Sequence, residues 1–560
     1  MVELRVLDGP NLYFTRAAIK LTLDVSRWLA LPQARVEQLT RRTGFTASAS
    51  AGQPESDQRR RYIARFMVYV TRTLADASGT HLAVRGRLGP VPEQIVIAFP
   101  WRRRGAAEAF AHELAPLLSV GLDGRRSMDR AIAAAAKRLE TVPAGAPPTT
   151  LSPTIPVIAV TGTNGKTTTV RLIAHLARAA GHTVAYTTTD GVYRDQELVE
   201  EGDYSGFSGA AKALAQPGID FAVLETARGG ILLRGIGTDH NDVAVVTNVT
   251  EDHLDQYGIR TIDQLAEVKG AITRITRPDG WDVLNADDPR VLAMRRLASG
   301  RPWLFSLDAD HPAIRTTLAE GGRAISVLDR VLVVMTSRQQ VHHLLPLEDI
   351  PVALAGISSP YLRNAMAAAA AALGAGVSEE AVAEGLRSFV LDPDSNPGRA
   401  NLFELEGRVV VIDYAHNEDG MRGLLEICQG LRSGSARIFL AFGSAGDRTN
   451  VILHRLAYAA ARGADRPAIA ELHRYLRGRD PQDLVERLQA GLHDGGKPAA
   501  PVFPNEVAAL TWMLAESAPN EVVAITALGQ RREIFELLRS KGAEAVGPAR
   551  LRELVQRARR

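Results

Sequence analysis

The sequence predicts an α/β protein built around a mostly parallel, doubly wound sheet, with a smaller α/β domain after it and a small α+β domain before it. Three observations predict this fold class. A glycine-rich loop at 161–168 lies between a buried strand and a helix, strand and helix signals alternate from 151 to about 395, and the alternation begins again after a turn-rich joint at 392–399. Such alternation is typical of parallel sheets covered by helices on both faces.

The loop at 161–168 has the layout of a phosphate-binding loop. It reads T-G-T-N-G-K-T-T, follows the apolar run 156–160 and precedes a helix with apolar periodicity. Its glycines let backbone N–H groups converge on phosphate oxygens, and the helix N-terminus favours an anion. The general pattern has glycine where this chain has Val160, so the loop is a narrower form. The residues expected to hold the phosphates, with Thr167 also on Mg²⁺, are Gly162, Thr163, Asn164, Gly165, Lys166, Thr167 and Thr168.

The composition narrows the class of protein. The chain has 560 residues, 46% of them hydrophobic and 23% charged, which predicts a globular protein of about three or four domains. A net charge of +3 is too small to argue for a nucleic-acid partner. The single cysteine, Cys428, excludes an internal disulfide and a cysteine-built zinc site. No apolar run approaches the roughly 20 residues of a membrane span, and no signal-peptide layout opens the chain, so we expect a cytoplasmic protein without a membrane partner.

Residues 1–140 are expected to form the small α+β domain. Strands are predicted at 3–7, 81–86 and 94–99, the last two as a hairpin, and helices at 62–74 and 106–118. This part of the chain shows no catalytic constellation of residues.

A Pro- and Thr-rich stretch at 141–156 predicts a semi-rigid linker. It separates the first domain from a central domain at 157–395. After the phosphate loop, the central domain has predicted strands at 184–187, 221–224, 243–248, 281–285 and 303–306. Because ligands of such sheets bind beyond the carboxyl ends of the strands, the polar residues that follow these runs are the candidates for a site.

Two of these strand ends carry groups suited to a metal. Glu225 closes the run 221–224, and a carboxylate beside a phosphate loop suits Mg²⁺, with a helix-capping or salt-bridged glutamate as the alternative. His253 lies among carboxylates in the stretch N-V-T-E-D-H-L-D at 248–255. A lone histidine is most often structural, and for His253 metal contact or substrate orientation stands beside that interpretation.

Two further candidate residues lie on the next predicted helix and at the end of the next predicted strand. Lys269, on a helix predicted at 263–275, is by residue chemistry alone a solvated charge. Asn285 opens the stretch N-A-D-D-P at 285–289, where it could contact a base edge, while Asp287 could cap the following helix.

The C-terminal domain, 396–560, repeats the α/β pattern on a smaller scale. Strands are predicted at 408–412, 437–442 and 521–526, and helices at 505–515 and 532–538, without a second phosphate loop. Two α/β domains joined by a turn, one of which holds the nucleotide, predict a cleft that closes over the reactants.

Several separated motifs together resemble the Mur ligases. They are TGTNGKTT, the D-H-L-D around His253, Lys269, NADDP and the D-Y-A-H-N at 413–417. YTTTDG at 186–191, LETARGGIL at 224–232 and NPGRANLFEL at 396–405 resemble, more narrowly, the Mur-ligase-like part of the cyanophycin synthetases, and LRVLDGPNLY at 4–13 resembles their N-terminal domain. Those enzymes carry an ATP-grasp domain between the two parts, where residues 141–156 leave room only for a linker.

The resemblance implies an ADP-forming carboxylate–amine ligase that uses ATP and Mg²⁺ and works through an acyl phosphate. It implies that Lys166 neutralises the transferred phosphate, that Thr167 and Glu225 hold one Mg²⁺, and that His253 binds a second metal with Lys269 as a carbamate. Asn285 and Asp413 become candidates for the nucleoside. The candidates for orienting a substrate or closing the domains are Thr188, Arg228, Arg399, His416 and Arg448, with Arg399 also a catalytic candidate.

The partners stay open at this stage. The resemblance implies an amino acid such as arginine and an aspartate or polyaspartate carboxylate as substrates, and it makes self-association plausible. Because the ATP-grasp segment is missing, the alternative is a regulatory or partner-dependent subunit that binds ATP and docks on a separate ATP-grasp polymerase. A switch-type nucleotide hydrolase is disfavoured because no guanine-specificity motif is present.

Overall fold

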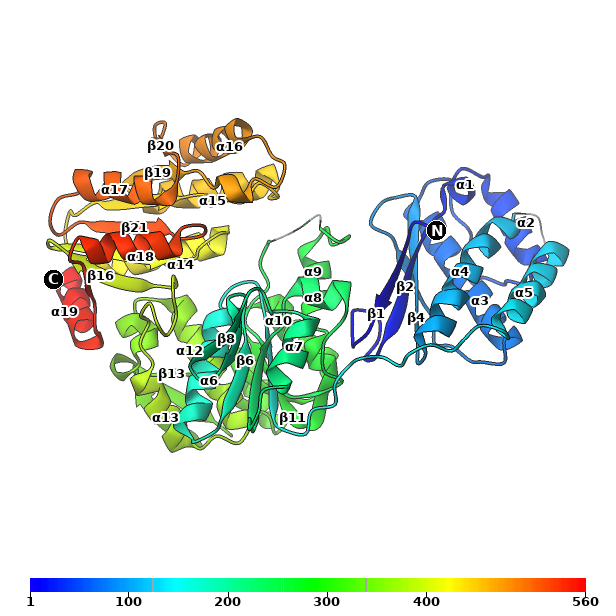
Figure 1. Ribbon diagram of the computed structural model, residues 1–560, viewed down its shortest axis with the longest axis horizontal. Coiled ribbons are helices and arrows are strands. Elements are labelled where there is room, and N and C mark those ends of the chain that lie inside the picture. The colour runs from blue at the N-terminus through cyan, green and yellow to red at the C-terminus, as the bar shows by residue number, and fades with distance from the viewer. Residues whose placement is uncertain (123–124, 253, 255, 338–339) are drawn as a thin grey trace.

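The computed structural model describes residues 1–122, 125–252, 254, 256–337 and 340–560. Within them the chain forms three sheets that follow one another along the sequence. Figure 1 shows an elongated arrangement, with the N-terminal sheet at one end, the largest sheet in the middle and the C-terminal sheet at the other end. The middle part therefore contacts both of the others and is the structural centre of the molecule.

The N-terminal sheet is antiparallel, in the order β1-β2-β4-β3. Its strands are β1 (Glu3–Leu7), β2 (Ala18–Asp24), β3 (Arg85–Leu88) and β4 (Gln94–Pro100). One face packs on helices around the buried residues Trp28, Phe66 and Phe99; the helices are α1 (Ser26–Leu29), α2 (Gln33–Arg42), α3 (Asp57–Ala77), α4 (Arg104–Val120) and α5 (Arg125–Leu139). The predicted hairpin is confirmed, although its first strand lies at Arg85–Leu88 and not at 81–86, and β2 was not predicted.

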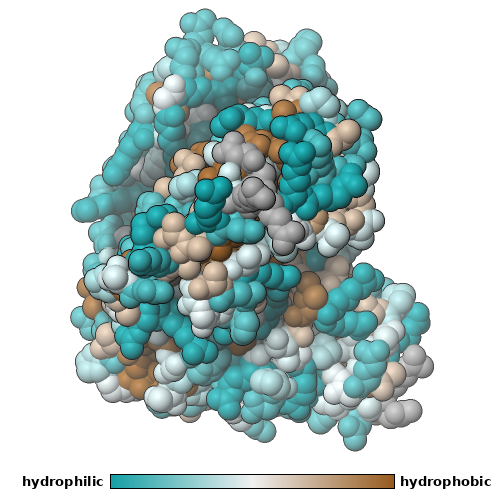
Figure 2. Space-filling model, turned by 90° about the vertical axis from the view of Figure 1, so that its right-hand side faces the viewer, coloured by the Kyte–Doolittle hydropathy of each residue, from teal (hydrophilic) through white to brown (hydrophobic). Residues whose placement is uncertain are grey.

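The loop after β1 joins the N-terminal domain to the middle of the molecule. Arg274 Nη2 donates to the backbone oxygen of Asn11 at 2.8 Å, and Arg234 pairs with Asp8 at 2.9 Å. Apolar residues on both sides, such as Leu12 and Ile236, share one buried cluster. Figure 2 views the molecule from the N-terminal side, where hydrophilic residues cover most of the face and hydrophobic ones form small separate groups.

The central sheet has a parallel middle and antiparallel edges, in the order β15-β14-β13-β12-β11-β10-β5-β9-β6-β7-β8. The parallel strands are β5 (Val157–Thr161), β6 (Val184–Thr187), β9 (Phe221–Glu225), β10 (Asn241–Val246), β11 (Thr276–Asn285), β12 (Arg301–Phe305) and β13 (Arg323–Leu328). The edge strands are β7 (Gly191–Arg194), β8 (Glu197–Glu201), β14 (Val331–Met335) and β15 (Val341–Pro346). The predicted doubly wound sheet is thus confirmed, with the phosphate loop after its central strand β5.

The helices of this part cover both faces of the sheet. They are α6 (Lys166–Ala179), α7 (Phe207–Leu214), α8 (Arg228–Leu233), α9 (Ile262–Lys269), α10 (Pro289–Ala293), α11 (Pro312–Ala319), α12 (Ser359–Gly374) and α13 (Glu379–Ser388). The alanine run 365–372 in α12 is fully buried, which lets α12 pack closely on α6 and the sheet. The helix predicted at 263–275 is wrong in its end: α9 stops at Lys269, and a separate 3₁₀ turn follows at Ile272–Ile275.

The C-terminal sheet is parallel in its middle, in the order β20-β19-β18-β21-β17-β16-β22. Its strands are β16 (Asn401–Leu405), β17 (Arg408–Asp413), β18 (Ile438–Phe442), β19 (Arg466–Ala470), β20 (Val502–Phe503), β21 (Val522–Thr526) and β22 (Glu544–Ala545). Its helices are α14 (Glu418–Leu431), α15 (Asn450–Gly463), α16 (Pro481–Asp494), α17 (Glu506–Glu516), α18 (Arg531–Ser540) and α19 (Pro548–Arg559). The predicted strands of this region are confirmed.

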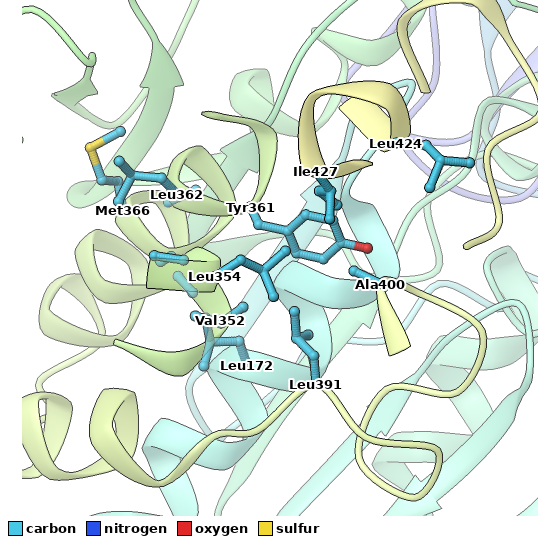
Figure 3. Close-up of a cluster of buried hydrophobic side chains, with 14 of the residues drawn as sticks. Leu172, Val352, Leu354, Tyr361, Leu362, Met366, Leu391, Ala400, Leu424 and Ile427 are labelled. Carbon is cyan, nitrogen blue, oxygen red and sulfur yellow. The ribbon is translucent and has the colours of Figure 1, made fainter. Parts of the chain in front are cut away.

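The central and C-terminal parts share apolar packing. Figure 3 shows the ring of Tyr361, from α12, among Leu354 of the central part and Leu424 and Ile427 of α14. All four belong to one buried cluster. None of the helices in the described part of the chain combines the length and apolar character needed to cross a bilayer.

Candidate active site

A large cavity of about 860 Å³ lies between the central and C-terminal sheets. Its central wall is formed by the residues that follow β5, β9, β10 and β11, which is where a parallel sheet binds its ligands. Its opposite wall comes from the loops after β17, β18 and β19. Nearly every site residue predicted from the sequence borders this space.

The phosphate loop turns sharply at two glycines. Gly162 has φ of 152° and Gly165 has φ of 84°, a backbone conformation that L side chains rarely adopt. A Cβ atom on Gly162 would overlap Thr247 Oγ1, and one on Gly165 would overlap Asn364 Oδ1. Both positions therefore require glycine, for the backbone conformation and for space.

Helix α6 begins directly after Gly165 and points its N-terminus at the cavity. No side chain caps this end, so its first N–H groups are available to an anion. Lys166 lines the cavity, and its Nζ donates to the carbonyl oxygen of Thr163 at 2.8 Å. The N–H groups of Thr163 and Asn164 already donate to Asn248, so the backbone donors left for phosphates are those at the start of α6, beside the Lys166 ammonium group.

Glu225 is placed as a metal-ligand candidate would be. It is 2% exposed, and its Oε2 accepts a hydrogen bond from Thr167 Oγ1 at 2.9 Å. Burial raises its pKa, while Lys166 and the Thr167 hydroxyl lower it. Its Oε1 is buried and has no hydrogen-bond partner among the described residues. A partnerless carboxylate oxygen beside a threonine hydroxyl fits Mg²⁺, which prefers oxygen ligands.

Lys269 is not the solvated charge that residue chemistry alone suggested. It is 4% exposed at the end of α9, and its Nζ donates to the carbonyl oxygen of Gly162 at 2.5 Å. Burial and the nearby Lys166 hold its pKa well below the usual range, although Asp252 acts in the opposite direction. A lowered pKa increases the share of neutral amine, and the neutral amine is the form that can react as a nucleophile.

His253 lies outside the described residues. Its neighbour Asp252 is 7% exposed and pairs across the cavity with Arg448 Nη2 at 3.3 Å and with His416 Nε2 at 3.5 Å. The loop after β10 therefore meets the C-terminal domain through these two predicted residues. Where the chain is described, no group of three or more histidine, cysteine, aspartate or glutamate side chains is gathered as a metal site.

Arg228 opens α8 on the central wall. Its Nη2 donates to Gln256 Oε1 at 2.8 Å, and its guanidinium lies over the ring of Tyr257. Gln256 in turn donates to Asp447 Oδ2 of the C-terminal domain at 2.9 Å. Arg228 thus belongs to the same bridge between domains as Asp252.

The two candidates for binding the nucleoside, Asn285 and Asp413, differ in the hydrogen bonds that they already make within the protein. Asn285 borders the cavity, yet its Nδ2 donates to Thr247 O at 2.8 Å and its Oδ1 accepts from Asp287 N. One amide hydrogen and one lone pair remain. Asp413 Oδ2 accepts from the Tyr361 hydroxyl and from Ala400 N, each at 2.9 Å. Burial raises the pKa of Asp413, and these hydrogen bonds lower it.

The expected helix cap at Asp287 is wrong. Asp288 caps α10 by accepting from the backbone N–H groups of Arg290 and Val291. Asp287 instead pairs with Arg363 Nε at 2.9 Å and contacts Ser306. Arg363 also borders the cavity and was not predicted.

Of the predicted residues Thr188 and Arg399, only Arg399 borders the cavity. Thr188 is fully buried, and its Oγ1 accepts from Asp190 N at 3.1 Å, whereas the neighbouring Thr189 borders the cavity. Arg399 borders the cavity, and its Nη2 donates to Thr167 Oγ1 at 3.4 Å. Sequence reasoning missed Asp190, which contacts Arg399, although it lies just beyond the end of β6, at the edge of the sheet where Glu225 ends β9.

Two parts of the chain match descriptions of a single family. Residues 160–372 match the Mur ligase middle domain, and residues 398–529 match the Mur ligase glutamate ligase domain. Across these two domains the chain belongs to the Mur ligase family of ATP-dependent amino-acid ligases.

Within that family the chain is similar to cyanophycin synthetases. It is 36% identical to the enzyme of Synechocystis sp. over 66% of this chain and 42% of that protein, and 39% identical to the enzyme of Crocosphaera subtropica over 57% and 36%. The chain spans less than half the length of these relatives. It is also 26% identical to the UDP-N-acetylmuramoyl-L-alanyl-D-glutamate–2,6-diaminopimelate ligase of Geobacillus thermodenitrificans, over 68% of this chain and 75% of that enzyme.

Solved structures share the fold of the two-domain part. E. coli FolC in complex with DHPP and ADP has a TM-score of 0.51 at 20% identity, over 70% of this chain and 90% of that chain. A bifunctional folylpolyglutamate synthase/dihydrofolate synthase with Mn, AMPPNP and L-glutamate bound has a TM-score of 0.50 at 17% identity, over 69% and 90%. These likenesses confirm the predicted fold class.

Proposed function

We propose that this protein joins a carboxylate to the amine of an amino acid, with ATP converted to ADP and phosphate through an acyl phosphate. One observation carries the proposal: Lys166, the Thr167–Glu225 pair and Lys269 lie together on the floor of the cavity between the domains. Family membership supports the same reaction class.

The residues divide the work between binding and charge stabilisation. ATP supplies the phosphoryl group and Mg²⁺ neutralises part of its charge. The N–H groups of the loop and Lys166 hold the outer phosphates, and Thr167 with Glu225 provides oxygen ligands for the metal. Arg399, close to Thr167, and Arg228 on the central wall would give positive charge where the carbonyl oxygen of the acyl phosphate becomes an oxyanion as the amine attacks it.

Lys269 is proposed to act as a carbamate. In its neutral form the buried amine can add to CO₂ with loss of one proton, and the resulting carbamate would be an anionic oxygen ligand for a second metal. His253 is the partner ligand that the family resemblance proposes. Omitting bicarbonate from degassed buffer would then lower the activity, and adding it back would restore the activity.

The relatives suggest the substrates. By analogy with the cyanophycin synthetases, the amine is an amino acid such as arginine and the acceptor an aspartate or polyaspartate carboxylate. We also propose that the chain divides into domains at 1–140, 157–395 and 396–560, acts in the cytoplasm and self-associates.

Phosphate release tests the proposal. Purified protein with Mg²⁺ and ATP is given each amino acid singly, with and without polyaspartate. Release that requires one amino acid and one acceptor, with the conjugate seen by mass spectrometry, supports the ligase and names both substrates. No release with any combination of these compounds contradicts a ligase that acts alone.

A partner-dependent subunit is the second candidate. It is favoured by one observation, that the chain matches only 42% of the length of the Synechocystis sp. enzyme. The same assay repeated with a purified ATP-grasp polymerase separates the two, because a subunit releases phosphate only in the presence of that polymerase.

A further inference from the structure

Asp190 is a meeting point for three segments of the chain. It lies in the turn between β6 and β7, and its side chain is 17% exposed. Among the described residues its carboxylate contacts three guanidinium groups: Arg171 Nη2 at 2.9 Å, Arg531 Nη1 at 3.0 Å and Arg399 Nη1 at 3.3 Å. These arginines come from the phosphate-loop helix, the C-terminal domain and the joint between the domains.

Arg399 connects this cluster to the reaction floor. One of its nitrogens, Nη1, faces Asp190 and the carbonyl oxygen of Pro397, while Nη2 reaches Thr167 Oγ1. Its guanidinium lies over the ring of Tyr414. Asp190 and Tyr414 therefore fix the orientation in which Arg399 Nη2 reaches the phosphate loop.

Arg531 brings the position of the C-terminal domain into the cluster. It is the first residue of α18, and it donates to Asp190 Oδ1 and to the carbonyl oxygen of Pro397. Gly398 has φ of 71°, and a Cβ there would lie 2.6 Å from Arg531 Cδ. Arg531 can make these contacts only when α18 lies against the turn after β6, so the contacts depend on how the two domains are placed.

The charges favour a positioning role over a simple ion pair. The cluster holds three guanidinium groups and the Asp190 carboxylate, and Glu225 also interacts electrostatically with Arg399, so positive charge stays in excess beside Thr167. Without Asp190, the three guanidinium groups would repel one another in a largely buried place. An excess of positive charge beside a phosphate loop is useful only if one cation is held toward the ligand.

We propose that Asp190 is a positioning residue that couples docking of the C-terminal domain, sensed by Arg531, to the placement of Arg399 beside Thr167. The inference rests on the proposed ligase function for its kinetic consequence. Arg171 anchors the cluster to α6 and to the joint, because its Nη1 also donates to the carbonyl oxygen of Ser395.

A double-mutant cycle tests the coupling. Asp190→Asn and Arg531→Ala should each lower kcat about ten- to a hundredfold with little change in the KM for ATP. The double variant should fall no further than the more affected single variant, because both changes remove the same arrangement. Arg532→Ala is the matched control, since Arg532 is the next residue of α18, is 89% exposed and pairs only with Glu536 among the described residues.

Two kinetic outcomes overturn the proposal. If the losses from Asp190→Asn and Arg531→Ala multiply in the double variant, the residues act independently. If Arg531→Ala behaves like Arg532→Ala, Asp190 serves Arg399 alone and does not sense the domain.

A distance measurement does not depend on turnover. Cys428, the single cysteine, is buried, so spin labels can be attached at Glu197→Cys and Glu536→Cys, two exposed positions on the central and C-terminal parts. With Mg²⁺ and AMPPNP, the parent should give one narrow distance distribution, and Asp190→Asn and Arg531→Ala should each broaden it. An unchanged distribution in both variants overturns the coupling even if no ligase substrate has been found, whereas broadening without phosphate release contradicts only the proposed reaction.

Discussion

The two walls of the cavity are built in different ways. The floor of the central wall is formed by backbone turns and short side chains next to one sheet, such as Gly165, Thr167 and Glu225. The C-terminal wall reaches the same space with longer side chains, such as His416 and Arg448, whose partners lie on the other domain. The central wall is therefore formed by local folding, whereas the C-terminal wall is complete only when the domains are docked. Chemistry common to a family suits the first kind of wall, and selection of a particular substrate suits the second.

The largest expected effect is on the central wall. Lys166→Ala should lower turnover by a factor of roughly 10² or more, as loss of a group that stabilises charge in the transition state typically does. Phosphate release under saturating ATP measures it. As a control, Lys541→Ala changes an exposed lysine that does not border the cavity and should leave turnover unchanged. Normal turnover in a folded Lys166→Ala variant would contradict the assignment of the phosphate loop.

Substitutions at two glycines, at opposite ends of α6, test whether the phosphate loop of the central wall is rigid. Gly165 and Gly181 both have positive φ, of 84° and 92°, but a Cβ would overlap Asn364 at Gly165 and meets nothing within 4 Å at Gly181. Gly181→Ala should cost about 1 kcal/mol from backbone strain alone. Gly165→Ala should cost about 2 kcal/mol more, as measured by chemical denaturation. Equal losses would show that the loop relaxes easily.

The C-terminal wall offers a matched pair of arginines. Arg448 and Arg455 both pair across the gap, Arg448 with Asp252 at 6% and 8% exposure and Arg455 with Glu251 at 48% and 40%. Arg448→Ala should raise the KM of an amino-acid or acceptor substrate about tenfold, because it removes the guanidinium partner of the buried Asp252 carboxylate. Arg455→Ala should change it less than about twofold. If the two substitutions changed the KM equally, burial of the contact between the domains would not determine its importance for substrate binding.

The smallest effect is a gain in stability. Burial raises the folded-state pKa of Glu225, so its stabilising contribution is complete below about pH 4.3, the ordinary value, and is lost as pH rises through the folded-state pKa. Glu225→Gln should therefore increase the free energy of unfolding of nucleotide-free protein by about 1 kcal/mol at pH 8. The difference in the free energy of unfolding should vanish near pH 4. The same substitution should abolish ligase activity, because it removes a proposed metal ligand. If Glu225→Gln were less stable than the parent at pH 8, the inference that the Glu225 carboxylate is poorly stabilised in the nucleotide-free protein would be wrong.

The sequence predicted the central wall better than the C-terminal wall, and the reason is physical. Gly165 and Thr167 lie in the loop and helix that follow the buried strand β5, and Glu225 ends the buried strand β9, so local patterns place them at one edge of the sheet. The contact between Asp190 and Arg531 joins residues 341 apart in the chain, and no periodicity or turn signal contains it. Lys269 shows the intermediate case, because its helix was predicted but its burial depends on packing against the phosphate loop.

The outermost strand of the largest sheet has a consequence for assembly. All five residues of β8 are exposed, and the strand carries Glu197, Glu200 and Glu201 beside Leu198 and Val199. An open strand edge can template pairing with another chain, and charged side chains are the usual protection against it. Two copies that met edge to edge at β8 would bring like charges together. Self-association through extension of this sheet is therefore opposed by the charged residues of its own edge strand, and the self-association proposed above would use another surface.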